Sequence, residues 1–361
     1  MTKAILVCGL LLSGLPAAGQ ADRLHALILT GASDAPYHDW CQSAPFLRGV
    51  LERSGRFDVK VIEQVPGITA ATLAPFDVLV LDYNGPRFGA PTEQAIEEFV
   101  GSGKGLISFH AASYGQAYGM VFDRAARRWK PGPDNGWRAY PALIGARWDT
   151  SKIGHGARHV FPVKWIDPEH PICRGLPPSF PANDELYHRL DLLPGTHVLA
   201  TAFSDPATGG TGRDEPIVWT SAFRRGRTVH LTLGHDPSAM VQPGFQAAFA
   251  RGAEWAATGA VKPTAAQAKT PVRVLAVTGG HSYPTGFYTL FEGYDDIAWS
   301  HATSPREAFT ADLAARFDVI VLHDMWQDLA PKEREHLRAF VEAGKGIVST
   351  HHAIVDYTAW P

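Results

Sequence analysis

Residues 103–115 read GKGLISFHAASYG, and residues 344–357 read GKGIVSTHHAIVDY. In both stretches a short apolar run follows Gly-Lys-Gly and ends on a histidine, which is typical of a buried strand that leads into a ligand-binding loop. Residues 76–114 align without gaps on residues 317–355, and 13 of the 39 aligned positions are identical. Unrelated segments of ordinary composition would share about two or three positions. The chain therefore contains an internal repeat.

Strand-like and helix-like segments alternate around the first stretch. Continuous or alternating apolar runs predict strands, and apolar residues at helical spacing that are closed by glycine predict helices. We expect strands at 24–30, 57–63, 76–82 and 105–110, and helices at 43–55, 91–103 and 244–259. This alternation predicts an α/β fold with a flavodoxin-like, doubly wound and mostly parallel sheet.

The chain divides into four predicted parts. We expect a signal peptide at 1–21, a complete domain at 22–259, a linker at 260–271 and an incomplete second copy of the domain at 272–361. The second copy stops at DYTAWP, before any counterpart of the segments DELYHR, VWTSAF and GHD of the first copy. A half sheet leaves its last strand as an open edge. We therefore expect a fragment or truncated gene product whose complete chemistry resides in the first domain.

The N-terminus has the features of a secretory signal peptide. The basic start MTK precedes the apolar run AILVCGLLLSGL, and small residues suited to cleavage follow near Gly19 or Ala21. No second segment of membrane-spanning length follows, so we expect a periplasmic or secreted protein with no membrane association after cleavage. Cys41 and Cys173 would then remain, and their spacing leaves open whether they pair.

The composition is that of a globular protein, with 45% hydrophobic and 19% charged residues. A net charge of −3 and the lack of any Lys/Arg run argue against nucleic acid as a partner. The sequence has no G-x-x-x-x-G-K-[ST], no G-x-G-x-x-G after a strand and no H-E-x-x-H, which argues against nucleotide cofactors and zincin chemistry. Nothing in the sequence indicates an oligomeric state.

Several motifs, in order, resemble those of the ThuA-like family, whose fold is similar to that of class I glutamine amidotransferases. Over residues 24–257 they are TGASDAPYHDW, GKGLISFHAA, HVFPVKWIDPEHPICRGLP, DELYHRL, PIVWTSAFRRGRTVHLTLGHD and RGAEWAATG. TGGHSYP, FDVIVLHDM and GKGIVSTHHAIVDY look like the opening of a second such domain.

The resemblance implies a small-molecule carbohydrate as the partner, because the family is named for trehalose utilisation and is associated with catabolism of sugars oxidised at carbon 3. The amidotransferase fold presents a nucleophilic Cys at a strand-to-helix turn, where this sequence reads Phe-His-Ala-Ala. The amidotransferase fold is therefore implied, but its reaction is not.

The candidate catalytic residues follow strands, because open α/β sheets bind ligands beyond the carboxyl ends of their strands. His110 ends one strand, and His235 and Asp236 end another within GHD. Glu185 is instead raised as a site residue by the resemblance. It lies three residues before His188, so the two would share a face of a helix or point to opposite faces of a strand. As alternatives, His110 could be a structural residue bonded to a loop carbonyl, and Asp236 could be a helix cap.

The candidate substrate-binding residues lie in loops at the same edge of the predicted sheet or, like Tyr187, are raised by the resemblance. Aromatic side chains among them could stack on a sugar ring. The set is His38, Asp39, Asp82, Tyr83, Tyr114, His155 and Tyr187.

Three functional classes are open at this point. The first is an enzyme that acts on a carbohydrate or an oxidised (3-keto) sugar by histidine and carboxylate acid–base chemistry, without a cofactor or with one divalent metal of the zinc kind. The second is a non-catalytic sugar-binding module on the same fold. The third is a metal-binding protein with His110 and His235 among its ligands.

Overall fold

The computed structural model describes residues 23–33, 37–126, 128–148, 153–262, 271–283, 285–292, 294 and 296–360. The predicted signal peptide and most of the predicted linker lie outside these residues. In the part of the chain that the structure describes, no helix is long and apolar enough to cross a membrane. Cys41 is exposed and Cys173 is buried, and both are free thiols.

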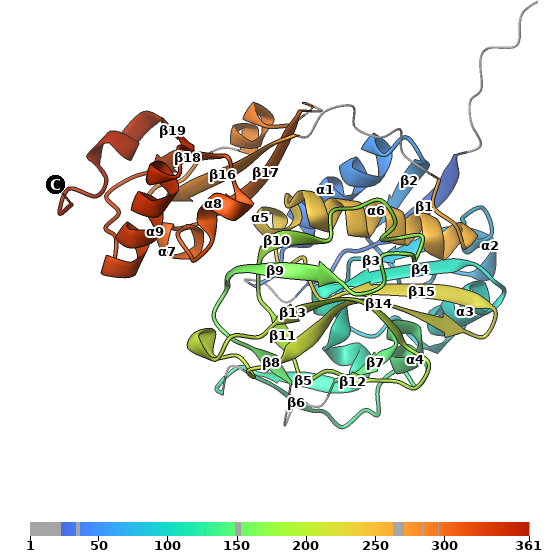
Figure 1. The fold of residues 1–361 in the computed structure, drawn as a ribbon. Coiled ribbons are helices and arrows are strands. Elements are labelled where there is room, and N and C mark those ends of the chain that lie inside the picture. The colour runs from blue at the N-terminus through green and yellow to red at the C-terminus, as the bar shows by residue number, and fades with distance from the viewer. Residues whose placement is uncertain are drawn as a thin grey trace, which may run out of the picture.

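A nine-stranded sheet, in the order β10-β9-β13-β14-β15-β4-β3-β1-β2, organises the first part of the chain (Figure 1). Five neighbouring strands pair in parallel and follow the flavodoxin order. They are β1 (Leu24–Leu29), β2 (Phe57–Ile62), β3 (Val78–Leu81), β4 (Gly105–Phe109) and β15 (Gly226–Leu231). The predicted α/β fold with a large central sheet is confirmed.

The remaining four strands extend this sheet in antiparallel pairs. They are β9 (His159–Trp165), β10 (Ser179–Asp184), β13 (His197–Phe203) and β14 (Asp214–Phe223). The sheet is thus mixed, and its antiparallel half brings β10 to the outer edge, at the side where the C-terminal unit packs (Figure 1).

Helices cover both faces of the parallel half because its strands are apolar on both faces. Ala26 and Ile28 of β1 pack with α1 (Trp40–Arg53) and α6 (Pro243–Thr258). The alternate residues Leu27 and Leu29 pack with the opposite layer, which contains α3 (Ala90–Gly101). The smaller elements are α2 (Ala70–Leu73), η1 (His110–Ser113), η2 (Gln116–Tyr118), β5 (Met120–Asp123), β6 (Arg128–Pro131), α4 (Tyr140–Ile144), β7 (Ala146–Arg147), β8 (Gly154–His155), β11 (Tyr187–His188), β12 (Asp191–Leu192), η3 (Pro206–Thr208) and α5 (Pro237–Met240).

The C-terminal unit contains a second, four-stranded parallel sheet in the order β17-β16-β18-β19. This order corresponds to β2-β1-β3-β4 of the large sheet. The strands are β16 (Val272–Gly279), β17 (Ile297–Ala302), β18 (Val319–Asp324) and β19 (Gly346–Ser349). The helices are η4 (Thr285–Leu290), α7 (Pro305–Ala308), α8 (Leu313–Arg316), α9 (Pro331–Glu342) and η5 (His351–Val355). β19 is an edge strand with exposed residues throughout.

The C-terminal unit, drawn in orange and red in Figure 1, packs beside β10 and α5 of the first domain. The Asn183 amide donates to the His301 carbonyl oxygen at 2.8 Å, and the Gln242 amide donates to the same oxygen at 3.2 Å. Val241 is buried in an apolar cluster with Trp299 and other residues of the second sheet. Asn183, which donates the first of these hydrogen bonds, lies two residues before Glu185 in the sequence.

A candidate active site of three histidines and a glutamate

His110 occupies a strained turn directly after β4. Its φ is +39°, a left-handed conformation that is uncommon for any residue with a Cβ and that is concentrated at functional sites. The ring is fully buried. Its Nδ1 donates to the carbonyl oxygen of Thr232 at 2.8 Å, and its own carbonyl accepts from the Ser113 hydroxyl at 2.7 Å. The first bond fixes the orientation of the imidazole, and the second holds the backbone of the turn.

His235 is placed by the turn that follows β15. Gly234 makes this turn at φ +110°, and a Cβ there would lie only 2.9 Å from a ring carbon of Phe109. The buried Asp184 carboxylate accepts from the backbone N–H of Gly234 at 2.6 Å and from that of His235 at 3.4 Å. Burial raises the pKa of Asp184 to about 6, although Arg158 opposes the shift. Asp184 thus fixes the backbone that carries His235.

Three imidazoles and one carboxylate meet at the carboxyl edge of the sheet. The ring centroid of His38 lies 5.0 Å from that of His110 and 4.8 Å from that of His235. The centroids of His110 and His235 are 5.2 Å apart. His110 Nε2 lies 3.2 Å from His235 Nδ1. Glu185 Oε2 lies 3.4 Å from His235 Nδ1, 3.7 Å from His110 Nε2 and 3.5 Å from His155 Nε2. We call His38, His110, His235 and Glu185 the histidine cluster.

The charges within the histidine cluster follow from this packing. Burial acts to raise the pKa of Glu185, but the hydrogen bond with His235 and the neighbouring imidazoles outweigh it and lower that pKa. Burial acts to lower the pKa of His235, and Glu185 more than offsets it, so the pKa of His235 is raised. Burial, followed by His38 and His235, lowers the pKa of His110 well below its usual value. Glu185 is therefore an ionised carboxylate beside a neutral His110.

An aromatic wall adjoins the histidine cluster. The Tyr187 hydroxyl lies 3.0 Å from His110 Nε2, and the Tyr187 ring stacks on His155 at 5.7 Å between centroids. The register of β8 and β11, which pairs Tyr187 with His155, produces this stack. Trp148 lies 5.6 Å from Tyr187 and 5.1 Å from Tyr114, again between ring centroids. These rings supply apolar faces beside polar groups.

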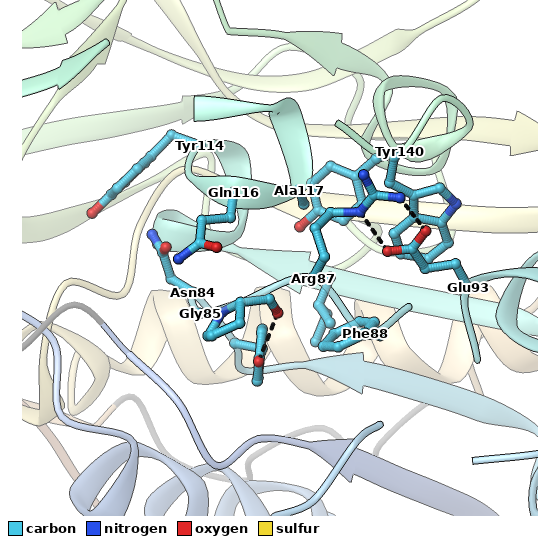
Figure 2. Close-up of a pocket in the computed structure, with 13 residues that line it drawn as sticks. Asn84, Gly85, Arg87, Phe88, Glu93, Tyr114, Gln116, Ala117 and Tyr140 are labelled. Carbon is cyan, nitrogen blue, oxygen red and sulfur yellow. Dashed lines mark hydrogen bonds and ion pairs between the residues drawn. The ribbon is translucent and has the colours of Figure 1, made fainter. Parts of the chain in front are cut away.

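Two open cavities lie on this side of the domain. One spans about 380 Å³, part of it open solvent, and is lined by His38, Asp39, Asp82, Tyr83, His235 and Asp236, among others. The other spans about 310 Å³, again partly open solvent, and is shown in Figure 2, where Asn84 and Tyr114 lie on one side and Arg87 pairs with Glu93 on the other. Tyr83 and Asn84 line both cavities.

The structure brings six of the sequence-predicted site residues into direct contact with one another. They are His38, His110, His155, Glu185, Tyr187 and His235. Tyr114 joins them through its hydroxyl, which lies 3.3 Å from His38 Nδ1. Glu185 follows β10 and His188 lies in β11, so the helix considered for this pair does not form.

The three predicted aspartates line the cavity but are engaged in holding the fold. Asp39 caps α1 by accepting from Cys41 N at 3.0 Å. Asp82 accepts from the hydroxyls of Ser43 and Thr30. Asp236 caps α5 and forms an ion pair with Arg158 at 2.7 Å. For Asp236 the geometry is that of the helix cap considered from the sequence. The carboxylate that contacts the His235 ring is that of Glu185.

Three residues of the site were not found from the sequence. Asp184 positions His235, Arg158 pairs with Asp236, and Trp148 lies between the two tyrosines. Asp184 directly precedes Glu185 in DELYHR, so its place in the motif was a usable signal. Arg158 and Trp148 lie in segments without periodicity, and their contacts depend on tertiary structure alone.

Comparisons with known proteins agree on one family. The family model described as "ThuA: Trehalose utilisation" matches residues 25–256. A crystal structure of a ThuA-like protein from Parabacteroides merdae ATCC 43184 is similar at 30% identity and a TM-score of 0.57, covering 67% of this chain and 93% of that one. A second ThuA-like protein, from Bacteroides uniformis ATCC 8492, shares the fold at 19% identity and a TM-score of 0.52, with 69% and 98% covered. No curated protein matches the chain.

Proposed function

Because this chain belongs to the ThuA family, we propose that it is an enzyme acting on a carbohydrate, and specifically on a sugar oxidised to a ketone at carbon 3. The observation that carries the proposal is the Glu185 carboxylate, which lies 3.4 Å from His235 Nδ1 and 3.7 Å from His110 Nε2. A carboxylate and imidazoles within reach of one another, at the ligand-binding edge of an α/β sheet, are what acid–base catalysis needs.

A ketone makes the neighbouring C–H bonds acidic, so the reaction class that fits is proton abstraction next to a carbonyl. Glu185 is the base: its carboxylate takes the carbon-bound proton and becomes a carboxylic acid. The enolate that forms carries its charge on oxygen, and the Tyr187 hydroxyl beside His110 donates a hydrogen bond to it. When the proton comes from carbon 2, the enolate expels the glycosidic oxygen from carbon 1 and a C1=C2 double bond forms. The proton on Glu185 passes to that leaving oxygen, which restores the carboxylate and balances the step.

The aromatic wall and the aspartate-lined cavity provide the binding surface. Tyr114 and Trp148 present ring faces to a sugar, and the polar groups that line the larger cavity accept hydrogen bonds from its hydroxyl groups. No cysteine nucleophile takes part, because His110 occupies the turn after β4 and the two described cysteines lie elsewhere, Cys41 exposed and Cys173 in the core. The proposed chemistry therefore differs from that of a glutamine amidotransferase.

Turnover of a panel of 3-keto-glycosides, compared with the parent glycosides, tests this function. We expect consumption of the keto sugars only, with loss of turnover in Glu185→Gln. A thermal shift with sugars and no turnover of any of them would contradict the enzyme and favour a sugar-binding module.

We further propose that the first domain acts alone and that residues 272–361 are a partial second copy of it. The repeated sequence and the matching strand order support this. Protein comprising residues 22–262 should turn over the substrate as fast as the full chain. A strong loss in the shorter protein would assign part of the site to the C-terminal unit.

We also propose export, which rests on the N-terminal sequence pattern. Mass spectrometry of protein expressed with its own leader should find a mature start near Gln20 or Asp22. A cytoplasmic pool that retains Met1 would contradict this.

A further inference from the structure

The spacing of the histidine cluster matches the coordination shell of a metal ion. One ring nitrogen from each of His38, His110 and His235 lies within 4.8 Å of the others. A tetrahedral zinc ion with bonds of about 2.0–2.1 Å separates its nitrogen ligands by about 3.4 Å. The distance from His110 Nε2 to His235 Nδ1 is 3.2 Å. Two of the three nitrogens are thus already at coordination spacing, and a small ring movement brings in the third.

Hydrogen bonds to the outer side of the histidine cluster are of the kind that orients metal-binding imidazoles. Metal-bound histidines donate their other ring N–H to a carbonyl, carboxylate or water, which fixes the tautomer. His110 makes such a bond from Nδ1 to the Thr232 carbonyl oxygen at 2.8 Å, so its Nε2 keeps a lone pair on the cluster side. The Tyr114 hydroxyl lies 3.3 Å from Nδ1 of His38, and Asp184 holds the backbone of His235.

The surrounding charge suits a cation. Glu185 Oε2 lies within 3.7 Å of nitrogens from two of the three histidines, close enough to be a fourth ligand or to face a bound water. Arg158, a cationic side chain beside the site, is already paired with Asp236. Three imidazoles and a carboxylate therefore surround the position without a competing positive charge from that arginine.

The C-terminal unit repeats the arrangement independently. His351 follows β19 as His110 follows β4, and it too has a positive φ, +52°. One ring nitrogen each from His281, His351 and His352 lies within 4.8 Å of the others. Although most aligned positions differ between the two stretches, both retain a strained histidine at this turn and collect two more around it. Such recurrence is not required for packing, because His351 and His352 are exposed.

We propose that His38, His110 and His235 bind one divalent transition-metal ion of the zinc kind, with Glu185 beside its open position. Imidazole donors select Zn²⁺, Co²⁺, Ni²⁺ or Cu²⁺ over Mg²⁺ and Ca²⁺, which take oxygen ligands. Three protein ligands and one open position are the pattern of catalytic rather than structural zinc sites. The proposal needs no assumption about the substrate, and it leaves Glu185 and Tyr187 as the proton-carrying groups.

Metal binding to the full chain tests the site without reference to activity. The protein is stripped with a chelator and titrated with Zn²⁺ by calorimetry and with Co²⁺ by its visible ligand-field absorption, with Mg²⁺ as the negative probe. We expect the histidine cluster to bind one Zn²⁺ ion per chain, with a Kd below about 1 µM. His38→Ala and His235→Ala should each raise the Kd of this Zn²⁺ ion by at least about 100-fold. Loss of a ligand should reduce the affinity at least as much as loss of a hydrogen bond that supports a ligand.

Matched variants in the second cluster separate the two sites. His352→Ala removes an exposed histidine of the C-terminal unit. It should leave unchanged the Zn²⁺ affinity and the Co²⁺ spectrum of the site at His38, His110 and His235. His38 lies in a loop, so His38→Ala decides the question if a change at a buried histidine prevents folding, as monitored by circular dichroism. Wild-type affinity in both His38→Ala and His235→Ala would overturn the proposal, as would the absence of Zn²⁺ binding.

The outcome is also separable from that of the proposed function. Keto-sugar turnover by protein that binds no Zn²⁺ overturns the metal site alone. Tight Zn²⁺ binding that is lost in the cluster variants, with no turnover of any sugar, supports the metal site and contradicts the carbohydrate enzyme.

Discussion

His110 Nδ1 lies 2.8 Å from the carbonyl oxygen of Thr232. A carbonyl oxygen only accepts, so Nδ1 must carry the hydrogen and the neutral ring keeps its lone pair at Nε2. That atom lies 3.0 Å from the Tyr187 hydroxyl and 3.2 Å from His235 Nδ1. A single backbone contact thereby decides which nitrogen of His110 is available for chemistry.

Replacing His110 by Asn should remove activity and preserve the fold. Asn tolerates a positive φ better than most residues, so the strained turn survives while the imidazole is lost. We expect kcat to fall by about 100-fold or more and the melting temperature to fall by less than about 5 °C. Keto-sugar kinetics and a thermal melt measure the two effects. A large drop in melting temperature with little change in kcat would assign His110 a structural role.

Glu185→Gln keeps the shape of the side chain and removes the proposed base. We expect kcat to fall by about 10² to 10⁴-fold, the usual contribution of a positioned acid or base. Glu169→Gln is the matched control, because the Glu169 side chain is 87% exposed and belongs to no part of the site. Equal kcat values for the two variants would exclude Glu185 as the base.

Trp148→Ala should weaken sugar binding more than it slows the chemical step. Trp148 contacts the rings of Tyr114 and Tyr187, and its own side chain carries no proton in the proposed step. We expect KM to rise several-fold, corresponding to the loss of about 1 kcal/mol of aromatic contact, with kcat changed less. Trp326→Ala, at an exposed tryptophan of the C-terminal unit, should change neither constant. A fall in kcat alone would place Trp148 in the chemistry instead.

Asp82 should make stability fall as the pH rises. Burial raises its pKa to about 7, against the hydrogen bonds from Ser43 and Thr30, whereas in the unfolded chain the value is about 3.9. Between these values the folded state holds a proton that the unfolded state releases. The free energy of unfolding therefore declines from about pH 4 to pH 7, by at most about 1.4 kcal/mol per pH unit from this group.

Urea unfolding of wild type and Asp82→Asn at several pH values between 4 and 8 isolates this contribution, because other titrating groups are common to both proteins. The variant should show a smaller decline with pH than wild type. Asp58→Asn, at a half-exposed carboxylate paired with Arg23, should keep the wild-type decline. If the free energy of unfolding depended on pH in the same way in wild type and Asp82→Asn, the raised pKa of Asp82 would be refuted.

Gly234→Ala should destabilise the domain through steric contact as well as backbone strain. Its new Cβ would lie 2.9 Å from Phe109 and 3.0 Å from Phe245 at a φ of +110°. Gly175 also has a positive φ, +77°, but nothing lies within 4 Å of a Cβ there. We expect Gly175→Ala to cost about 1 kcal/mol and Gly234→Ala about 2–4 kcal/mol in denaturant unfolding. Equal costs would mean that Phe109 and Phe245 move aside freely.

The sequence predicted those parts of the molecule that depend on local pattern. The strands at 24–30 and 105–110 and the closing helix at 244–259 were found within a residue or two because apolar periodicity and glycine endings mark them. His110 and His235 were identified as site candidates because the carboxyl ends of parallel strands share one edge.

Other parts could not be read from local pattern. The antiparallel half of the sheet depends on long-range register, so the neighbours of Glu185 depend on where β10 ends and β11 begins. The partner of Asp236 could not be predicted either, because Arg158 lies 78 residues away.

Asn183, Asp184 and Glu185 are consecutive, yet each contacts a different part of the molecule: the His301 carbonyl of the C-terminal unit, the backbone of His235, and the histidine cluster. A ligand that shifts this end of β10 therefore also shifts the donor that holds the C-terminal unit. Thermodynamic reciprocity then requires that docking of the C-terminal unit changes ligand affinity by the same factor as the ligand changes docking. The contact at His301 thus joins the C-terminal unit to the same strand end that carries Glu185.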